Sequence, residues 1–388
     1  MKYDISEQIR YIGCDDKTLD LFEGQYIVPE GVSYNSYLIL DEKVAVVDTI
    51  DVRCTEEWLE NLATELGERK PDYVVVSHME PDHAASLQTL IERYSDIAIV
   101  GNAKTFAMID QFFETLPACC RVTVKDGDTL PLGIHTLQFL TAPMVHWPEV
   151  MLSYEQSEQV LFSADAFGKF GALDCYDGDW DCEARRYYFN IVGKYGAQVQ
   201  ALLKKVAPLD IHTIAPLHGP ILRENLTHCV EQYATWSSYR PETSGVIIAH
   251  ASIYGNTAKA AEALAEILRA KGAEKVAITD LTRDDRAEAV EDAFRYDRMV
   301  LACSTYDGGI FPPMEQFLAE LAHKNYQQRK VAIIENGSWA PMSGKKITEV
   351  LQTMKNITLC EHTVTLRSSF KHSDRAALEA LADELLAQ

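Results

Sequence analysis

The stretch Val74-Val75-Val76-Ser77-His78-Met79-Glu80-Pro81-Asp82-His83 decides how the rest of the chain is interpreted. It begins with three β-branched residues, which are typical of a buried strand. Directly afterwards, four side chains that can bind a metal fall within six positions: His78, Glu80, Asp82 and His83. A strand end is a rigid place from which to project ligands, and a loop after it lets them converge. The sequence therefore predicts a metal site at the end of this strand.

Three further candidate ligands lie at or just after later predicted strands: His146, Asp165 and His218. Each of them alone has a simpler explanation, either as a structural histidine or as an aspartate that caps the next turn. Together with the first cluster they provide four histidines and three carboxylates. We therefore treat all seven side chains as one candidate metal constellation.

The composition is that of a soluble globular protein. The chain has 388 residues, of which 47% are hydrophobic and 24% charged, so it is long enough for two domains. Its formal net charge of -22 would repel nucleic-acid phosphates and an anionic membrane surface, so we predict neither partner. Residues 1–10 lack the apolar core of a signal peptide, and the nine cysteines are scattered. These features predict a cytoplasmic location and free thiols.

The pattern of predicted elements changes near residue 244. Before it, strands alternate with helices, expected at 55–68, 84–93 and 102–113, and then give way to further strands; residues 168–196 show no regular pattern. This order predicts two sheets with helices outside. From Val246 onward, five strand–helix units predict a doubly wound parallel sheet. We expect an α/β protein with domains at residues 1–243 and 244–388.

The second domain opens with a loop that resembles the phosphate loop of flavodoxins. After the predicted strand at 246–251 come Ser252, Ile253, Tyr254, Gly255, Asn256 and Thr257, which open a helix. Hydroxyl groups and backbone N–H groups at a helix N-terminus hold a phosphate without a cationic side chain. A helix that is merely well capped would explain the same residues.

Two later loops strengthen the flavin interpretation. They follow the third and fourth strands of this domain and comprise Ser304, Thr305, Tyr306, Asp307 and Gly308, then Asn336, Gly337, Ser338, Trp339 and Ala340. Flavodoxins use the corresponding loops to flank the isoalloxazine ring, and ligands of such sheets bind at the carboxyl ends of the strands. The resemblance therefore implies FMN as a cofactor.

The order and spacing of the metal candidates resemble the metallo-β-lactamase fold, whose metal loop reads His-x-His-x-Asp-His. In this chain Glu80 stands in place of the second histidine. Imidazole-rich sites suit zinc, whereas added carboxylates favour harder, redox-active iron. His-x-Glu-x-Asp-His with a later His, Asp and His is the pattern of flavodiiron proteins. The likeness extends to residues 146–148, 163–168 and 187–190, and with the flavodoxin-like half it covers essentially the whole chain.

This resemblance implies a metallo-β-lactamase-like αββα sandwich joined to a flavodoxin-like domain, and a diiron centre. One iron would be held by His78, Glu80, His146 and Asp165, and the other by Asp82, His83, Asp165 and His218. His83 is the ligand that varies in the family. The implied activity is reduction of O2 to water, of NO to N2O, or of both, with FMN re-reducing the two iron ions. Trp147, Tyr187, Tyr188 and Tyr195 are candidates for supporting the ligands, or for packing alone.

The resemblance also implies partners. The electron donor would be external: rubredoxin, a rubredoxin reductase chain or reduced coenzyme F420. A head-to-tail homodimer, or a dimer of such dimers, would bring the FMN of one subunit to the irons of the other. Two alternatives stay open at this point. One is a binuclear zinc hydrolase fused to a flavodoxin-like domain, and the other is an electron carrier whose metal site is only structural.

Overall fold

The computed structural model describes residues 3–114, 116 and 120–387. Contacts divide the chain into two compact units, one formed by Met1–Tyr188 with Ala197–Ala234 and the other by Phe189–Gly196 with Thr235–Gln388. The domain boundary at residues 243 and 244 stays a prediction. Within the described part of the chain, no helix has both the length and the apolar character needed to cross a membrane.

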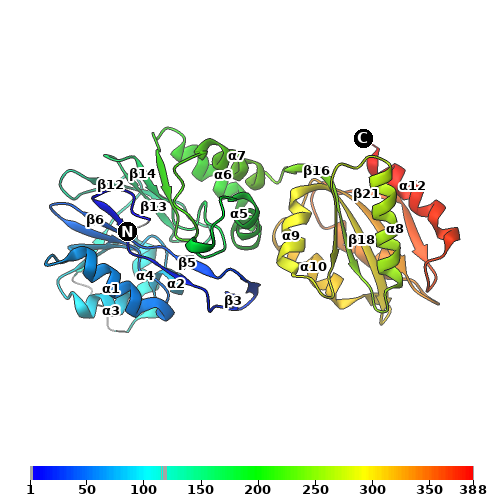
Figure 1. Cartoon of the computed structure of the whole chain (residues 1–388), viewed down its shortest axis with the longest axis horizontal. Helices are drawn as coiled ribbons and strands as arrows, with labels where there is room; N and C mark the ends of the chain where they lie inside the picture. The colour runs from blue at the N-terminus through cyan, green and yellow to red at the C-terminus, as the bar shows by residue number, and fades with distance from the viewer. Residues whose placement is uncertain (1–2, 115, 117–119, 388) are drawn as a thin grey trace. The chain divides into compact units, whose positions relative to one another are not determined.

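The first unit contains two sheets that face each other (Figure 1). The six-stranded sheet has the order β1 (Ile9–Tyr11), β6 (Tyr37–Leu40), β7 (Val44–Val47), β8 (Tyr73–Val75), β9 (Ala98–Gly101), β10 (Arg121–Thr123). The five-stranded sheet has the order β11 (Thr129–Pro131), β12 (Thr136–Thr141), β13 (Met151–Glu155), β14 (Val160–Phe162), β15 (Thr213–Ala215). Two short ribbons join β2 (Cys14–Asp16) to β5 (Val32–Tyr34) and β3 (Leu21–Phe22) to β4 (Tyr26–Ile27).

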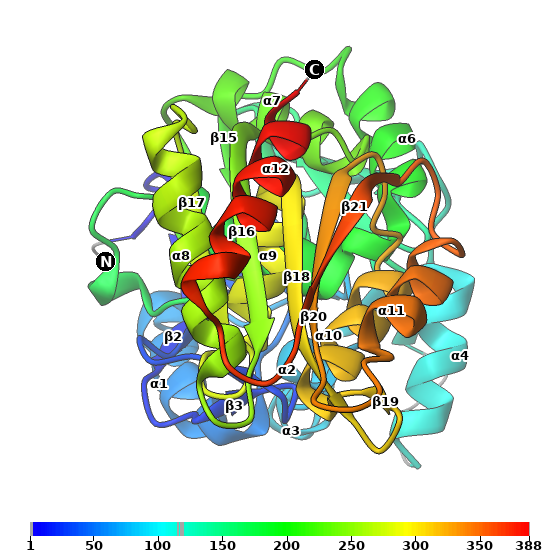
Figure 2. The ribbon, with the colours of Figure 1, turned by 90° about the vertical axis from the view of Figure 1, so that its right-hand side faces the viewer.

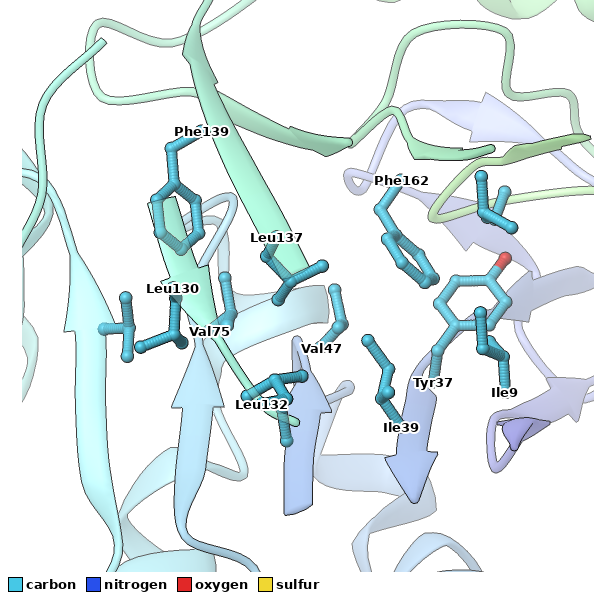
Figure 3. Packing of buried hydrophobic residues seen from close by; sticks show 14 of the residues in the cluster. Ile9, Tyr37, Ile39, Val47, Val75, Leu130, Leu132, Leu137, Phe139 and Phe162 are labelled. Atoms are coloured by element: carbon cyan, nitrogen blue, oxygen red, sulfur yellow. The ribbon is translucent and has the colours of Figure 1, made fainter. Parts of the chain in front are cut away.

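The core of this unit lies between the two sheets. Figure 3 shows Val47 and Val75 of the first sheet facing Leu137 and Phe162 of the second, and all four side chains are buried. The helices of the unit are α1 (Thr55–Leu66), α2 (Pro81–Ala84), α3 (Leu87–Arg93), α4 (Ala103–Phe112), α5 (Asp181–Tyr187), α6 (Gly196–Val206) and α7 (Leu226–Ser237). The predicted sandwich of two sheets with helices outside is confirmed.

Three local predictions for this unit differ from the structure. Pro81 begins the short helix α2, so Asp82 and His83 project from a helical turn and not from an open loop. Proline suits the first helical position because its fixed φ matches the helix and its missing N–H is not needed there. Residues 168–196 contain helix α5 and a π-helix at Tyr188–Val192. Strands β1 to β5 lie in the first 34 residues, for which no strand was predicted before residue 34.

The second unit is a parallel sheet with helices on both faces, as predicted. Its strand order is β17 (Val276–Asp280), β16 (Thr243–Ala251), β18 (Tyr296–Tyr306), β20 (Lys330–Asn336), β21 (Thr358–Leu366), which is the 2-1-3-4-5 order of flavodoxin-like sheets. Strand β19 (Gly309–Ile310) pairs antiparallel with β18. In Figure 2, α8 (Asn256–Ala270) and α12 (Arg375–Leu386) cover one face. The other helices are α9 (Arg286–Arg295), α10 (Pro312–His323) and α11 (Ser343–Leu351).

A segment from the middle of the chain belongs to this second unit. Phe189 stacks on Phe294 of α9 with ring centroids 4.2 Å apart. The side-chain amide of Asn190 donates to the carbonyl of Ala287, at 3.1 Å. The hydroxyl of Tyr239 donates to the carbonyl of Gly193, at 2.9 Å. The chain therefore contributes residues to the second unit before it completes the first.

Candidate functional site

The end of β8 is fixed from both sheets of the first unit. The backbone N–H of Ser77 donates to the buried carboxylate of Asp48, at 2.6 Å, and the carbonyl of Ser77 accepts from the N–H of Met151 in the second sheet, at 3.0 Å. His78 follows directly and is fully buried. Glu80 then takes the extended conformation that precedes α2. The side chains of His78 and Glu80 consequently project from a rigid strand end.

Asp165 follows β14 and His218 follows β15, and because these two strands pair in parallel, the two residues lie beside each other. The N–H of Leu217 donates to the carbonyl of Ala164, at 2.9 Å. The side chain of Asn35 donates to the carbonyls of Pro216 and Gly219, both at 2.8 Å. These bonds tie two loops that are distant in sequence, so the ligand candidates keep a fixed spacing.

The first group of candidate ligands consists of His78, Glu80, His146 and Asp165. Nε2 of His78 and Nε2 of His146 both lie 3.1 Å from Oε2 of Glu80. Oδ2 of Asp165 lies 3.2 Å from Nε2 of His78 and 3.4 Å from Nε2 of His146. One ligand atom from each residue lies within 4.8 Å of the others, which leaves them spaced around a single point.

The second group consists of Asp82, His83 and His218, and all three are buried. Oδ2 of Asp82 lies 3.2 Å from Nε2 of His218 and 3.3 Å from Nε2 of His83. Oδ1 of Asp165 also faces this group, at 3.3 Å from His83 and 3.7 Å from His218. Asp165 therefore presents one oxygen to each group, which is the geometry of a carboxylate between two metal positions.

The seven side chains fit a pair of metal ions. Both carboxylate oxygens of Asp82 and of Asp165 are buried and have no hydrogen-bond partner among the described residues, and the same holds for Nε2 of His83, His146 and His218. Buried polar atoms without partners are costly, and a metal ion would satisfy all of them at once. Each metal position is surrounded by two imidazole nitrogens and two carboxylate oxygens, with Asp165 shared between the two positions. Such a mixed set of ligands suits iron better than a set of imidazoles alone.

The carboxylates and imidazoles of the two groups shift one another's pKa values. Burial opposes ionisation of Asp165, but the nearby imidazole of His78 outweighs it and holds the pKa of Asp165 well below its usual range. Burial likewise opposes protonation of His146, but the nearby carboxylates of Asp165 and Glu80 raise its pKa to about 9. Carboxylates and imidazoles thus stabilise each other's charged forms, and bound metal ions would replace the imidazole protons.

Two buried partners of the ligands were not predicted. Oε1 of Glu149 lies 2.8 Å from Nδ1 of His78, and the carbonyl of Ser33 lies 2.8 Å from Nδ1 of His218. Ring nitrogens that face away from a metal usually donate to such oxygens. Glu149 lies only three residues after His146, which is the one signal in the sequence that could have pointed to it.

Aromatic rings line the first unit's metal candidates. The ring centroid of Trp147 lies 5.2 Å from that of His78, and Tyr187 lies 5.6 Å from His218. Phe22, from an N-terminal ribbon that was not predicted, lies 5.3 Å from His218. Of the other aromatic candidates, Tyr188 contacts the ring of Tyr233, at 5.1 Å, and Tyr195 belongs to the second unit.

The second unit carries a pocket of about 420 Å³ at the carboxyl ends of its strands. This volume suits a cofactor-sized ligand. Fourteen of the sixteen predicted flavin contacts line the pocket: Ser252, Ile253, Tyr254, Asn256, Thr257, Ser304, Thr305, Asp307, Gly308, Asn336, Gly337, Ser338, Trp339 and Ala340. Gly255 and Tyr306 are not among the lining residues, and Tyr306 instead lies against the ring of Phe311, with centroids 5.6 Å apart.

The three loops around this pocket are tied together by side chains. Oγ1 of Thr257 and Oγ of Ser304 are 2.9 Å apart, and Nδ2 of Asn336 donates to Thr257, at 3.2 Å. Oγ of Ser252 is buried without a hydrogen-bond partner among the described residues, so it could donate to a phosphate bound in this loop. Ser368, after β21, also lines the pocket and was not predicted. It follows a strand at the same sheet edge, and that position was the available signal.

Comparison with known proteins gives matches over both units. A family described as "ODP family beta lactamase" matches residues 32–219, and a flavodoxin-domain family matches residues 247–362. A relative named anaerobic nitric oxide reductase flavorubredoxin, from Vibrio vulnificus, is 31% identical over 352 residues, which cover 87% of this chain and 70% of that protein. An uncharacterized protein of Methanocaldococcus jannaschii is 29% identical and covers 95% of this chain and 93% of its own length.

Solved structures agree with this assignment. The rubredoxin oxygen:oxidoreductase of the anaerobe Desulfovibrio gigas superposes with a TM-score of 0.92 and 27% identity, covering 98% of this chain and 97% of that one. The flavodiiron protein of Giardia intestinalis has the same fold, with a TM-score of 0.90 at 24% identity. The residues, the two units and these relatives together establish that the chain belongs to the flavodiiron protein family.

Proposed function

We propose that this oxidoreductase reduces O2 to water, NO to N2O, or both, at a diiron centre in its first unit, with electrons supplied through FMN in its second. The observation that carries the proposal is Asp165, whose two oxygens face two separate groups of ligand candidates. In the same chain, a pocket with flavodoxin-like loops supplies a place for the electron-donating cofactor. A hydrolase would have no use for that pocket.

The roles of individual residues follow from their placement. His78, Glu80, His146 and Asp165 would hold one iron ion, and Asp82, His83, Asp165 and His218 the other. The iron pair and the flavin would each store two electrons, four in all, which is the number that reduction of O2 to two waters consumes, whereas reduction of two NO to N2O consumes two. The three carboxylates offset part of the metal charge. The rings of Trp147 and Tyr187 pack against His78 and His218 and would help to hold these ligands in place.

Metal analysis and gas consumption test this proposal. The protein purified without added metal should contain about two iron ions and one FMN per chain, as the ligand count implies. Once reduced without oxygen, it should be reoxidised by O2 or NO in stopped-flow measurements. Zinc in place of iron together with thioester or lactam hydrolysis would favour the zinc hydrolase, and a reduced protein that neither gas reoxidises would be an electron carrier. Consumption rates of the two gases, measured with one donor, would set their order of preference.

We further infer that the protein works as a head-to-tail homodimer, alone or paired into a homotetramer, in which the flavin of one subunit serves the irons of the other. Trp339 and Tyr254 support this inference, because they flank the flavin pocket and are 89% and 91% exposed. Large aromatic side chains left to solvent are a common feature of protein interfaces. Sedimentation of the purified protein would measure the assembly.

A complementation experiment tests the route of the electrons. Asp165→Ala should remove the metals, and Gly255→Asp should remove the flavin. Neither variant alone should turn over. Coexpressed as a mixed dimer, the two variants should regain activity if electrons cross between subunits, because one subunit then supplies the flavin and its partner the irons. A mixed dimer without activity would contradict the crossing.

The electron donor that we propose is rubredoxin or another external carrier such as reduced coenzyme F420. The relative from Desulfovibrio gigas is named for rubredoxin, which supports the first choice. Stopped-flow reduction of the FMN by each donor would rank them. A cytoplasmic location is supported by the thiols of Cys14, Cys54, Cys175, Cys229, Cys303 and Cys360, none of which forms a disulfide with another described residue.

A further inference from the structure

Glu149 is a fully buried carboxylate that contacts the metal candidates through one histidine. Its side chain is 1% exposed. Its Oε1 lies 2.8 Å from Nδ1 of His78 and also accepts a hydrogen bond from the N–H of Met79, at 2.8 Å. An ionised carboxylate only accepts hydrogen bonds, so Nδ1 of His78 must carry the proton. The lone pair of Nε2 is then directed at the first group of ligands.

The position of Glu149 is itself fixed. Its carbonyl accepts from the side-chain amide of Asn102, at 2.6 Å, and the carboxamide oxygen of Asn102 caps the N-terminus of α4. The other carboxylate oxygen, Oε2, is buried and has no hydrogen-bond partner among the residues that the structure describes. A carboxylate placed so deeply with half of its acceptors unused is costly to bury, and its stabilising contacts are the ones to His78 and Met79.

At the other metal position, no described carboxylate is hydrogen-bonded to the outer ring nitrogen of a histidine. Nδ1 of His218 is paired with a neutral backbone carbonyl, that of Ser33, at 2.8 Å. Nδ1 of His83 is buried without a partner within the described chain. A carboxylate partner makes an imidazole a stronger electron donor than a carbonyl does, and more so than no partner at all. The three rings therefore differ in basicity, with His78 the strongest.

We propose that Glu149 is a positioning residue that makes the two metal positions unequal. Acting through His78, it gives the position on the His78 side the higher affinity for a cation and the lower reduction potential. The proposal rests on the proposed diiron centre. It goes further by assigning the order in which the two positions bind metal and accept electrons. The electron arriving first should settle on the His218 side, because the histidines there have no carboxylate partner on their outer nitrogens and are weaker electron donors to the metal.

Two substitutions separate the geometric contribution of Glu149 from its charge. Glu149→Gln keeps an oxygen that accepts from both His78 and Met79 but removes the negative charge. Glu149→Ala removes both. The matched control is Glu155→Gln on β13, because Glu155 is equally buried and its carboxylate accepts from backbone N–H groups of Ser157 and Glu158, at 2.9 and 2.6 Å. Far-UV circular dichroism and the urea midpoint of the first unit report whether each variant has folded.

Metal affinity is the first measurement. The metal-free protein is titrated with Fe(II) under anaerobic conditions against a competing chelator. The native protein should bind two equivalents of different affinity. Glu149→Ala should weaken the tighter equivalent by about 10- to 100-fold, the usual effect of losing a histidine's outer partner, and leave the weaker one unchanged. Glu155→Gln should match the native protein. Equal weakening of both equivalents, or no weakening, would overturn the proposal.

The second measurement is a redox titration of the iron-loaded protein followed by the paramagnetic signal of the half-reduced pair. Glu149→Gln should raise the midpoint potential of one of the two steps and leave the other in place. If Glu149→Ala does not fold, the redox titration of Glu149→Gln alone decides the test. A native protein that binds no iron would overturn the diiron centre and this proposal together. Two bound irons with potentials insensitive to Glu149→Gln would overturn this proposal alone.

Discussion

Oδ2 of Asp165 lies 3.2 Å from Nε2 of His78, and its other oxygen is turned away from that ring toward the second group of ligand candidates. One side chain is thereby shared by both metal positions. Asp165→Ala should cost the protein both metals, whereas Asp82→Ala should cost only the metal on the His218 side, because Asp82 faces that group alone. Elemental analysis per chain checks this. The FMN absorption spectrum should be unchanged in both variants, and equal metal loss in the two would contradict the shared role of Asp165.

His83 should be the least necessary of the histidines. Its Nδ1 has no partner among the described residues, whereas Nδ1 of His218 is held by the carbonyl of Ser33. A ring without an outer partner is less firmly oriented and less basic, so it contributes less to metal affinity. We expect His83→Asn to keep both metals and His218→Asn to lose one. Metal retention after dialysis against a chelator measures the difference, and a loss as large in His83→Asn as in His218→Asn would refute it.

The backbone at Gly255 should be required for flavin binding. Gly255 has φ of +83°, directly before α8, and an added Cβ would meet no atom within 4 Å. A carboxylate there would face the bound phosphate. We expect Gly255→Asp to lower FMN affinity at least about tenfold, which requires a loss of only about 1.4 kcal/mol.

Gly272 supplies the control for that substitution. It also has a positive φ, +88°, and open space around its Cβ position, but it follows the other end of α8. Gly272→Asp carries the same charge and a similar backbone strain without approaching the phosphate. Fluorescence titration with FMN compares the two variants. Similar losses in both would mean that strain, and not repulsion of the phosphate, explains the effect.

The buried contact between His135 and Asp41 should make stability depend on pH. Burial lowers the pKa of His135, but hydrogen bonds to Glu158 and Asp41 outweigh it and raise that pKa; Glu155 adds to the negative field. The stabilisation that the protonated His135 provides is fully present below the pKa of histidine in the unfolded chain, about 6.5. It is lost as the pH rises through the raised pKa of His135 in the folded protein. Hydrogen bonds from His135 outweigh burial and lower the pKa of Asp41 to about 2. The ionised carboxylate of Asp41 therefore stabilises the fold at any pH above about 4, and this stabilisation is lost only as the pH falls from about 4 to about 2.

Urea unfolding at about pH 5.5 and about pH 9 measures this dependence. His135→Gln should destabilise the first unit more at the lower pH, where the native imidazole is charged, than at the higher one. The exposed His212, whose imidazole faces Asp210 and not His135, provides the control as His212→Gln. The prediction fails if both variants show the same change with pH.

Sequence reasoning worked best where function depends on strand ends. His78, His146, Asp165 and His218 each follow or lead a strand, and parallel or facing strands bring such residues to one place. It failed where the relevant contact joins segments whose spacing says nothing about their proximity. The role of Glu149 depends on a loop that returns to Met79, 70 residues earlier, and no periodic pattern encodes that return.

Short elements were also missed for physical reasons. Strands of two or three residues, such as β3 with Phe22, have too few positions to show an alternation of apolar and polar residues. The helical turn containing Asp82 and His83 is a single turn whose only sequence signal is Pro81. Ser368 was overlooked because its loop, Arg367-Ser368-Ser369-Phe370, carries no glycine of the kind that marked the other flavin loops.

The segment at residues 189–196 makes the two units interleaved along the chain, and this limits how they can be separated. A fragment that began at residue 244 would lack Phe189, the ring that stacks on Phe294, and Tyr239, whose hydroxyl donates to Gly193. After a cut near residue 244, residues 189–196 would belong to the N-terminal piece but would still pack on the flavodoxin-like unit. Separating the two pieces would expose the apolar surface that this segment covers. A proteolytic nick near residue 244 should thus give two pieces that stay associated until denatured.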